Sequence, residues 1–210
     1  MPGPRTNARC KRAGRSRSST DMATVDTSQR ILDVAERLVQ TRGFNGFSYA
    51  DIAEAMNVTK ASLHYHFRSK AELGARLIER YEKNFLAALA AIDEQTDDAG
   101  EKLRRYVAIY ASVVRAERMC LCGMLAAEYG TLPDEMRDFM RHFFDANERW
   151  LVGVLKDGKR AKRLTFKGTP AEAAQSLVGS LEGAMMIARS YGDPARFKAA
   201  SERMLADFGA

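Results

Sequence analysis

The sequence lacks the motifs on which many enzymes depend. It has no glycine-rich phosphate-binding loop, no Cys-x-x-Cys pair and no His-Glu-x-x-His motif. Of its three histidines, His64 and His66 form a pair with no Cys, Asp or Glu close in sequence to complete a metal site, and His142 is isolated. We therefore expect no catalytic activity, no metal and no cofactor.

Long apolar runs are also missing. No segment approaches the roughly 20 apolar residues that cross a bilayer, and the N-terminus lacks the apolar core of a signal peptide. No strand alternation and no internal repeat is present either. The hydrophobic content of 46% is sufficient for a buried interior. These features predict a cytoplasmic, all-α protein with no membrane partner.

Positive charge is concentrated at the N-terminus. Residues 1–21 hold six basic residues and one acidic residue, which accounts for all but one unit of the net charge of +6. This segment has almost no large apolar residue to bury, so we expect residues 1–26 to be a disordered tail. Two interpretations stay open: a basic arm that adds salt-sensitive affinity for DNA, or an upstream extension of a chain that naturally starts at Met22.

Residues 48–70 have the pattern of two short helices joined by a tight turn, followed by the cap of a third helix. Ser48 and Asp51 fit a capping pair for the first helix. Asn57 tolerates the left-handed backbone that a helix end requires, and Thr59 can cap the second helix. A short helix presented in this way suits the major groove of DNA.

The first residues of such a helix reach base edges, whereas later donors suit phosphate oxygens. Our candidates for base or near-base contact are Lys60, Ala61, Ser62 and His64. Our candidates for the DNA backbone are Tyr65, His66 and Lys70. The DNA-binding set is completed by Ser48, Tyr49 and Thr59.

The rest of the chain shows helical periodicity. A support helix is expected over residues 27–42, and a long helix from the Ser69 cap toward Asp93 would join two domains without a flexible linker. Further helices are expected at 101–117, 121–129, 134–156, 170–189 and 194–208, the fourth of these with a clear capping start at Thr169. The predicted domains are a three-helix DNA-binding domain over 27–70 and a helical domain over 71–210.

Residues 31–73 resemble the TetR family of bacterial transcriptional regulators. The matching positions are Ile31, Ala35, Leu38, Gly43, Phe44, Ile52, Ala53, Val58, Leu63, Phe67, Lys70 and Leu73. Asn57 stands where the family usually has Gly, and His64 stands where it usually has a Tyr that touches the DNA backbone. The resemblance implies a helix-turn-helix domain followed by an effector-binding and dimerisation domain. It also implies a homodimeric repressor that binds double-stranded DNA at a palindromic operator and is released by a small molecule.

The larger domain holds soft and aromatic residues that suit either a ligand cavity or an ordinary core. The candidates are Tyr106, Tyr110, Met119, Cys120, Met124, Glu128, Tyr129, Phe143, Trp150 and Met185. Core packing is the alternative for each residue, and the resemblance favours an effector pocket for the set. We expect Glu128 to be the buried polar group of this site.

Residues 119–124 resemble a stretch found in TetR-family members that respond to electrophiles or oxidants, with Cys120 at the matching position. Cys120 and Cys122 would point to nearly opposite sides of a helix, which disfavours a disulfide between them. A thiol at a helix start near Arg115 or Arg118 would have its thiolate favoured. The alternatives are a sensing thiol and a pair of small buried residues.

Gly179, Gly183 and Ser176 create a flat face on the helix expected at 170–189. The resemblance implies that this helix and the last one form a four-helix bundle across a two-fold axis; close packing within one chain is the alternative. A rival for the whole protein is a helical small-molecule-binding protein or enzyme with an incidental helix-turn-helix, against which the missing catalytic motifs count. A nearer rival is a DNA-binding regulator that has no effector.

Overall fold

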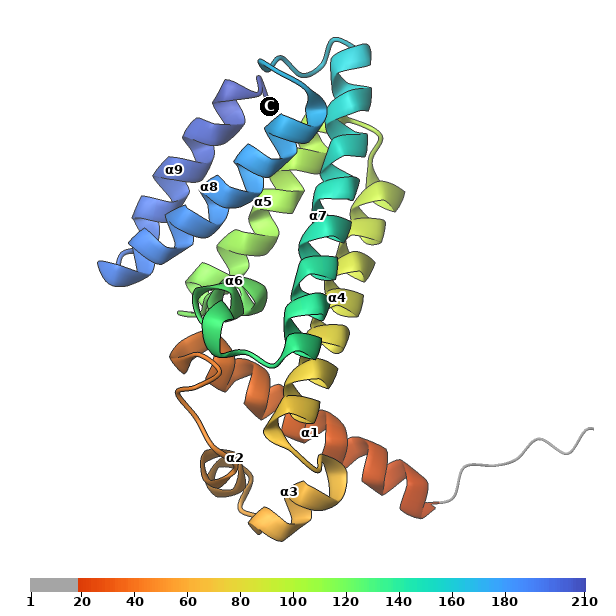
Figure 1. Ribbon diagram of the computed structural model, residues 1–210. Coiled ribbons are helices and arrows are strands. Elements are labelled where there is room, and N and C mark those ends of the chain that lie inside the picture. The colour runs from red at the N-terminus through yellow and green to blue at the C-terminus, as the bar shows by residue number, and fades with distance from the viewer. Residues whose placement is uncertain (1–18) are drawn as a thin grey trace, which may run out of the picture.

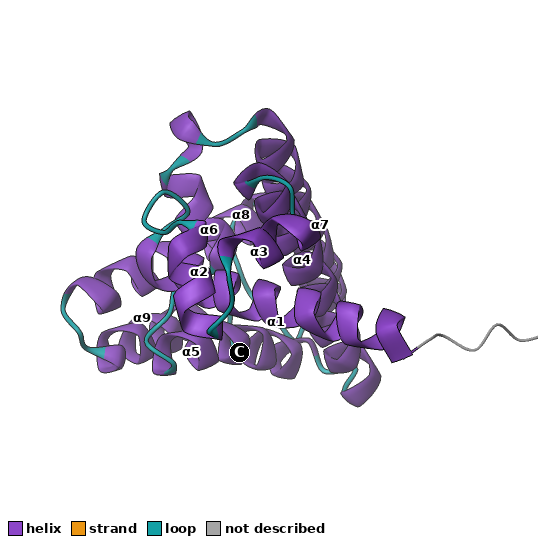
Figure 2. Cartoon of the chain, turned by 90° about the horizontal axis from the view of Figure 1, so that it is seen from below, coloured by secondary structure: helices purple, strands orange, loops and turns teal. Residues whose placement is uncertain are grey.

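The protein is described here by a computed structural model covering residues 19–210, in which side chains are described from Asp26 onward (Figure 1). All regular secondary structure in this part of the chain is helical, with loops joining the helices, which confirms the predicted fold class (Figure 2). No helix within these residues has the length and apolarity needed to cross a bilayer. The expected tail over residues 1–18 lies outside the described residues.

The N-terminal unit consists of α1 (Ser19–Arg42), α2 (Tyr49–Met56) and α3 (Lys60–His66), which lie together at the bottom of Figure 1. The helix α1 begins eight residues before the expected start. The expectation of disorder is therefore wrong for residues 19–26. That stretch contains no glycine or proline to interrupt a helix, and it opens with Ser-Thr-Asp, residue types that favour helix starts.

The second unit is built from longer helices. It contains α4 (Lys70–Gln95), α5 (Ala99–Arg115), α6 (Leu121–Ala127), the 3₁₀ turn η1 (Tyr129–Thr131), α7 (Asp134–Arg160), α8 (Pro170–Ser190) and α9 (Pro194–Asp207). The predicted helices are confirmed with small shifts at their ends, the largest being in α7, which continues four residues further. The helix α7 packs between α4 and α8, and α9 packs on α8 and α5 (Figure 1).

Local capping explains where the short helices begin and end. Ser48 and Asp51 form a capping box at α2, and Asn57 closes that helix with φ 54° and ψ 48°, in the left-handed region. Thr59 caps α3 by accepting a hydrogen bond from the Ser62 amide. These caps fix a tight turn between α2 and α3, so that α3 stands as a short helix isolated from its neighbours in sequence.

Candidate DNA-binding and effector sites

The helix α3 is held by one buried face and presents the other to solvent. Leu63 is fully buried beneath it and Val58 packs partly buried under the preceding turn. Lys60 and Ala61 are exposed, and Tyr65 is 78% exposed. Lys60 makes no hydrogen bond or ion pair with any described residue. The first turn of α3 therefore offers a cation and small side chains at an open surface, as base contact in a major groove requires.

Ser48 and Thr59 are exposed, but their side chains already act in helix caps. The Ser48 hydroxyl donates to Asp51 at 2.7 Å, and its oxygen accepts from the Ala50 amide at 3.2 Å. The Thr59 oxygen accepts from the Ser62 amide at 3.3 Å. Their contribution to a DNA surface is to set the starts of α2 and α3.

Tyr49 is placed differently from its expected role at the DNA surface. Its ring is buried, and its hydroxyl donates to the Phe67 carbonyl at 2.9 Å. Burial, with a smaller effect from Glu72, raises the pKa of Tyr49 to about 12. The ring also packs on the His64 imidazole, with centroids 4.7 Å apart. Tyr49 thus belongs to the core of the domain, and its ring supports the imidazole of His64, a candidate for base contact.

The two histidines of α3 face different partners. Nδ1 of His64 lies 3.3 Å from the Arg68 carbonyl oxygen, and its ring remains exposed. Nδ1 of His66 lies 3.1 Å from the hydroxyl of Ser28 on α1, which ties α3 to the support helix. His66 is accordingly half-buried, and of the two only His64 is fully presented to solvent.

Lys70 is turned inward, which corrects the expectation of a phosphate contact. Its Nζ donates to the carbonyls of Phe44 and Phe47 and lies 4.6 Å and 4.3 Å from the centroids of these two rings. Burial lowers the pKa of Lys70, while Glu128 and Asp51 oppose that shift. Lys70 therefore holds the loop between α1 and α2 in place, a long-range role that the sequence pattern does not reveal.

Arg68 is a candidate that the sequence analysis missed. It lies in the loop between α3 and α4 and is exposed. Its backbone amide donates to Glu72 at 3.0 Å, whereas its guanidinium makes no hydrogen bond or ion pair with any described residue. A free guanidinium beside the exposed face of α3 is suited to a DNA phosphate. Its position directly before the Ser69 cap is the sequence signal that could have identified it.

The core of the larger unit contains a buried polar network. The Tyr106 hydroxyl donates to Oδ1 of Asn147 at 2.9 Å, and Nδ2 of Asn147 donates to the Tyr110 hydroxyl at 3.1 Å. The three side chains are buried, and Trp150 stacks on Tyr106 at 5.7 Å. Asn147 was not among the predicted residues. It lies four residues after Phe143 on the apolar face of α7, and this polar interruption is the signal that could have found it.

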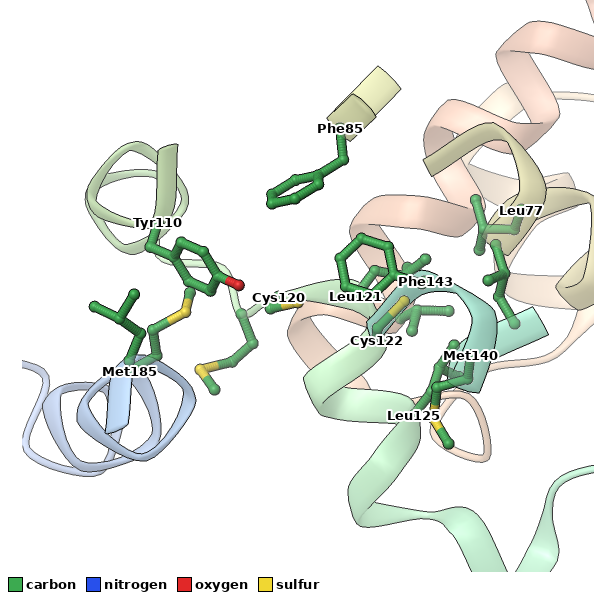
Figure 3. Packing of buried hydrophobic residues seen from close by; sticks show 14 of the residues in the cluster. Leu77, Phe85, Tyr110, Cys120, Leu121, Cys122, Leu125, Met140, Phe143 and Met185 are labelled. Carbon is green, nitrogen blue, oxygen red and sulfur yellow. The ribbon is translucent and has the colours of Figure 1, made fainter. Parts of the chain in front are cut away.

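Cys120, Cys122, Phe143 and Met185 meet in one buried cluster (Figure 3). Both thiols are free and buried, and the Tyr81 hydroxyl lies 3.8 Å from Sγ of Cys120. Burial raises the pKa of the Cys120 thiol well above its usual value, and the Glu182 carboxylate adds to that rise. The expectation of a favoured thiolate near Arg115 or Arg118 is therefore wrong, because desolvation dominates and neither arginine contributes.

Glu182 of α8 is the second polar group that the sequence analysis missed. Both of its carboxylate oxygens are closed off from solvent and accept no N–H or O–H hydrogen bond from a described residue, and the neighbouring Cys120 thiol is a weak donor. Burial raises the pKa of Glu182 to about 7. It lies three residues before Met185 and four after Val178, so it interrupts the apolar face of α8.

Two of the predicted pocket residues lie elsewhere. Glu128 is not a core carboxylate; it accepts hydrogen bonds from the amides of Phe44 at 2.6 Å and Asn45 at 3.1 Å, across the boundary between the two units. Tyr129 is exposed on η1, where Arg137 stacks on its ring. The other predicted residues are placed in or against the core. Tyr106, Tyr110, Met119, Cys120, Phe143 and Met185 are buried, and Met124 and Trp150 are partly buried.

The C-terminal end of α1 is hydrogen-bonded to the larger unit. The carbonyl of Gln40 accepts from the Met119 amide at 3.1 Å and from the guanidinium of Arg189 at 2.9 Å, and Arg189 also donates to the carbonyl of Thr41. On the other side of α1, Arg80 of α4 pairs with Glu36 at 2.7 Å. The N-terminal unit and the helical core are therefore joined by polar contacts as well as by α4.

A cleft of about 390 Å³ opens beside Arg189, between the end of α5 and the turn from α8 to α9. Its walls include Val114 and Met185, which also belong to the buried cluster, and two acidic and two basic residues, Glu117, Asp193, Arg118 and Arg189. This volume lies within the range of small-molecule sites. Met185, in the wall of the cleft, lies three residues after Glu182 on α8.

The outer face of α8 is flat and partly apolar. A Cβ added at Gly179 or Gly183 would meet no atom within 4 Å, so close packing within one chain does not explain these glycines. Ser176 is exposed on the same helix, and Met186 and Ile187 are each 55% exposed near its end. This face is available for a second helix pair.

Comparison with known proteins assigns both units to one group. The family model for bacterial regulatory proteins of the tetR family matches residues 31–77, and the model for a tetracyclin repressor-like C-terminal domain matches residues 99–204. The solved structure of a TetR-family transcriptional regulator from Agrobacterium tumefaciens superimposes with a TM-score of 0.86 at 32% identity. That match covers 89% of this chain and 100% of the other.

Two curated relatives match across most of their length. The transcriptional repressor NemR from Escherichia coli K12 is 28% identical over 179 residues, which cover 79% of this chain and 87% of NemR. The transcriptional regulator AcuR from Cereibacter sphaeroides is 26% identical over 190 residues, which cover 85% of this chain and 82% of AcuR.

Proposed function

The chain belongs to the TetR family of bacterial transcriptional regulators, and from this we propose that it is a homodimeric repressor that binds a palindromic operator and is released by a small molecule. The observation that carries the DNA-binding part is the open first turn of α3. Lys60 and Ala61 are exposed there, and Leu63 is the buried anchor of the helix. The action as a repressor rests on the relative NemR, which carries that description.

The proposed contacts divide into two groups. Lys60, Ala61, Ser62 and His64 would read base edges, whereas Tyr65 and Arg68 would contact phosphates. Ser48, Thr59 and His66 would hold α2 and α3 in their positions. The protein would act through binding, without catalysis.

Dimerisation would occur through the outer face of α8, together with α9. The open surface at Gly179 and Gly183 supports this assignment, because two helices can approach closely where side chains are absent. A two-fold dimer would place its α3 helices in successive major grooves, about 34 Å apart, which requires a palindromic operator.

The proposed effector site is the core around Tyr106, Tyr110, Cys120 and Met185. Its support is the polar network inside an otherwise apolar interior, together with the contacts that join Met119 and Arg189 to the end of α1. A ligand that displaces these core residues would move the support helix of the reading unit. A regulator without an effector is the competing proposal, and it predicts no thermal stabilisation by any small apolar ligand.

The test is selection of bound sequences from a random duplex pool by the purified protein. Wild type should enrich one palindromic motif, and Lys60→Ala should relax the preference at particular base pairs. Glu94→Gln is the matched control, since Glu94 is exposed on α4 and makes no contact that would affect α3. A protein that enriches no motif would contradict the proposed function. A version starting at Met22 tests whether the preceding basic residues add affinity.

A further inference from the structure

Glu182 is a buried carboxylate whose oxygens accept no N–H or O–H hydrogen bond from a described residue, and the Cys120 thiol beside it is a weak, neutral donor. Such a group is costly for a protein to keep, because a buried charge is normally paired or neutralised. Glu182 plays no part in the helix caps or in the contacts between the two units. Its buried position therefore suggests a role in binding a ligand.

The place of the carboxylate is set by Gly123 of α6. A Cβ at that position would collide with Oε2 of Glu182, so only glycine leaves room for the carboxylate between α6 and α8. Because both oxygens are already enclosed within one chain, a partner subunit docking on the outer face of α8 would not reach them. Whatever pairs with Glu182 must arrive from inside the core.

The neighbours of Glu182 are neutral near pH 7. Burial raises the pKa of Tyr106 and Tyr110 on α5, of Cys120 directly before α6 and of Cys122 on α6, and the Glu182 carboxylate adds a smaller rise to each. None of these four groups supplies a positive charge. Aromatic rings add to the setting, with Phe85 edge-on to both Tyr106 and Tyr110. Carboxylates and aromatic faces both attract cations.

The 390 Å³ cleft is separated from this carboxylate by Met185, and its two acidic and two basic lining residues balance each other in charge. Met185, which lines the cleft, lies three residues after Glu182 on α8 and therefore on a neighbouring part of the same helix face. A methionine side chain has several low-energy rotamers and can move aside to admit a ligand. The cleft would hold the apolar body of a ligand, whose polar head would reach Glu182 behind Met185.

We propose that the effector is an amine: a molecule with a protonated nitrogen that pairs with Glu182 and an apolar or aromatic body that lies in the cleft beside Met185. This inference rests on the proposed function and names the chemical class of its effector. A neutral donor would leave the carboxylate charge unbalanced, and an acid would be repelled by it.

The experiment uses three probes of similar skeleton: phenethylamine, phenethyl alcohol and hydrocinnamate. Binding to the full chain is measured by thermal shift and by calorimetry, and release of DNA is measured separately with an enriched duplex. We expect the amine to bind and to release DNA. Glu182→Gln, which keeps the shape of the side chain, should weaken amine binding by about ten- to a hundredfold, as expected for a lost charge-assisted hydrogen bond. Glu94→Gln should leave amine binding unchanged.

A second measurement keeps the test independent of how well the variant folds. In the wild type, amine binding should strengthen between pH 6 and pH 8, because Glu182 loses its proton in this range while the probe remains protonated. Equal binding of the amine and the alcohol, or an unchanged affinity in Glu182→Gln, would overturn the inference. If the alcohol or the acid releases DNA and the amine does not, the inference fails while the proposed function stands. If no duplex is bound at all, the proposed function fails, whatever the probes do.

Discussion

Replacing Glu182 by Gln should make the folded protein more stable at alkaline pH and leave its stability nearly unchanged at acidic pH. In the wild type, burial raises the pKa of this carboxyl from 4.5 to about 7. Between these two values the folded protein keeps a proton that the unfolded chain has released. The associated stability is therefore fully present below pH 4.5 and is lost as the pH rises to 7.

The size of the effect follows from the pKa difference. About 2.5 pKa units at about 1.4 kcal/mol each amount to roughly 3 kcal/mol of stability lost across this window. Gln has the same shape and carries no charge at any pH, so the variant avoids this loss. Its advantage over the wild type should be small at pH 5 and about 3 kcal/mol at pH 8.

The assay is urea unfolding of both proteins at pH 5, 6, 7 and 8, at one fixed protein concentration because subunit association adds to apparent stability. Glu94→Gln serves as the control for loss of one surface carboxylate. A stability difference between Glu182→Gln and the wild type that stays constant from pH 5 to pH 8 would refute the reasoning, since it would mean that the Glu182 carboxylate is already paired in the folded protein.

Four further predictions concern other residues. Lys70→Met should lower the free energy of unfolding by about 1–3 kcal/mol, because two carbonyls lose their donor; lost DNA affinity at unchanged stability would show a phosphate contact instead. Tyr65→Ala should weaken DNA binding about tenfold in a gel-shift titration without lowering Tm, since the ring is exposed; an unchanged affinity would remove Tyr65 from the interface. Glu128→Ala should lower the free energy of unfolding by about 1–3 kcal/mol, because it leaves the Phe44 and Asn45 amides uncapped, and wild-type stability in urea would contradict that role. Iodoacetamide should label Cys120 slowly in the native protein and rapidly in urea, as peptide mass mapping would report, and fast native labelling would show a thiolate that burial does not suppress.

Features that depend on neighbours in sequence were predictable. The capping pair of Ser48 and Asp51, the left-handed Asn57 and the Thr169 cap are each settled within a few residues, and all three match the structure. The family resemblance of residues 31–73 depends on the same kind of local pattern. These signals were enough to predict an all-α regulator with a helix-turn-helix.

Features that depend on distant partners were not predictable. Lys70 reaches carbonyls 23 and 26 residues away, and Glu128 reaches amides 83 and 84 residues away, so neither role is visible in the local sequence. Periodicity marks Asn147 and Glu182 as polar residues on apolar faces. It does not tell that Asn147 bonds to two tyrosines while Glu182 meets only the weakly donating thiol of Cys120, because that difference depends on the packing of other helices.

The capping of α1 by Met119 and Arg189 limits how this regulator can be divided. A helix normally has its last carbonyls satisfied by solvent or by residues that follow directly. Here, part of that task falls to a guanidinium 149 residues away. A chimaera that joins residues 19–70 to the larger helical unit of a relative would need an arginine and a main-chain amide at equivalent places in that unit. Exchange of the larger unit should therefore succeed among relatives that keep both donors to the last carbonyls of α1 and fail among relatives that lack them.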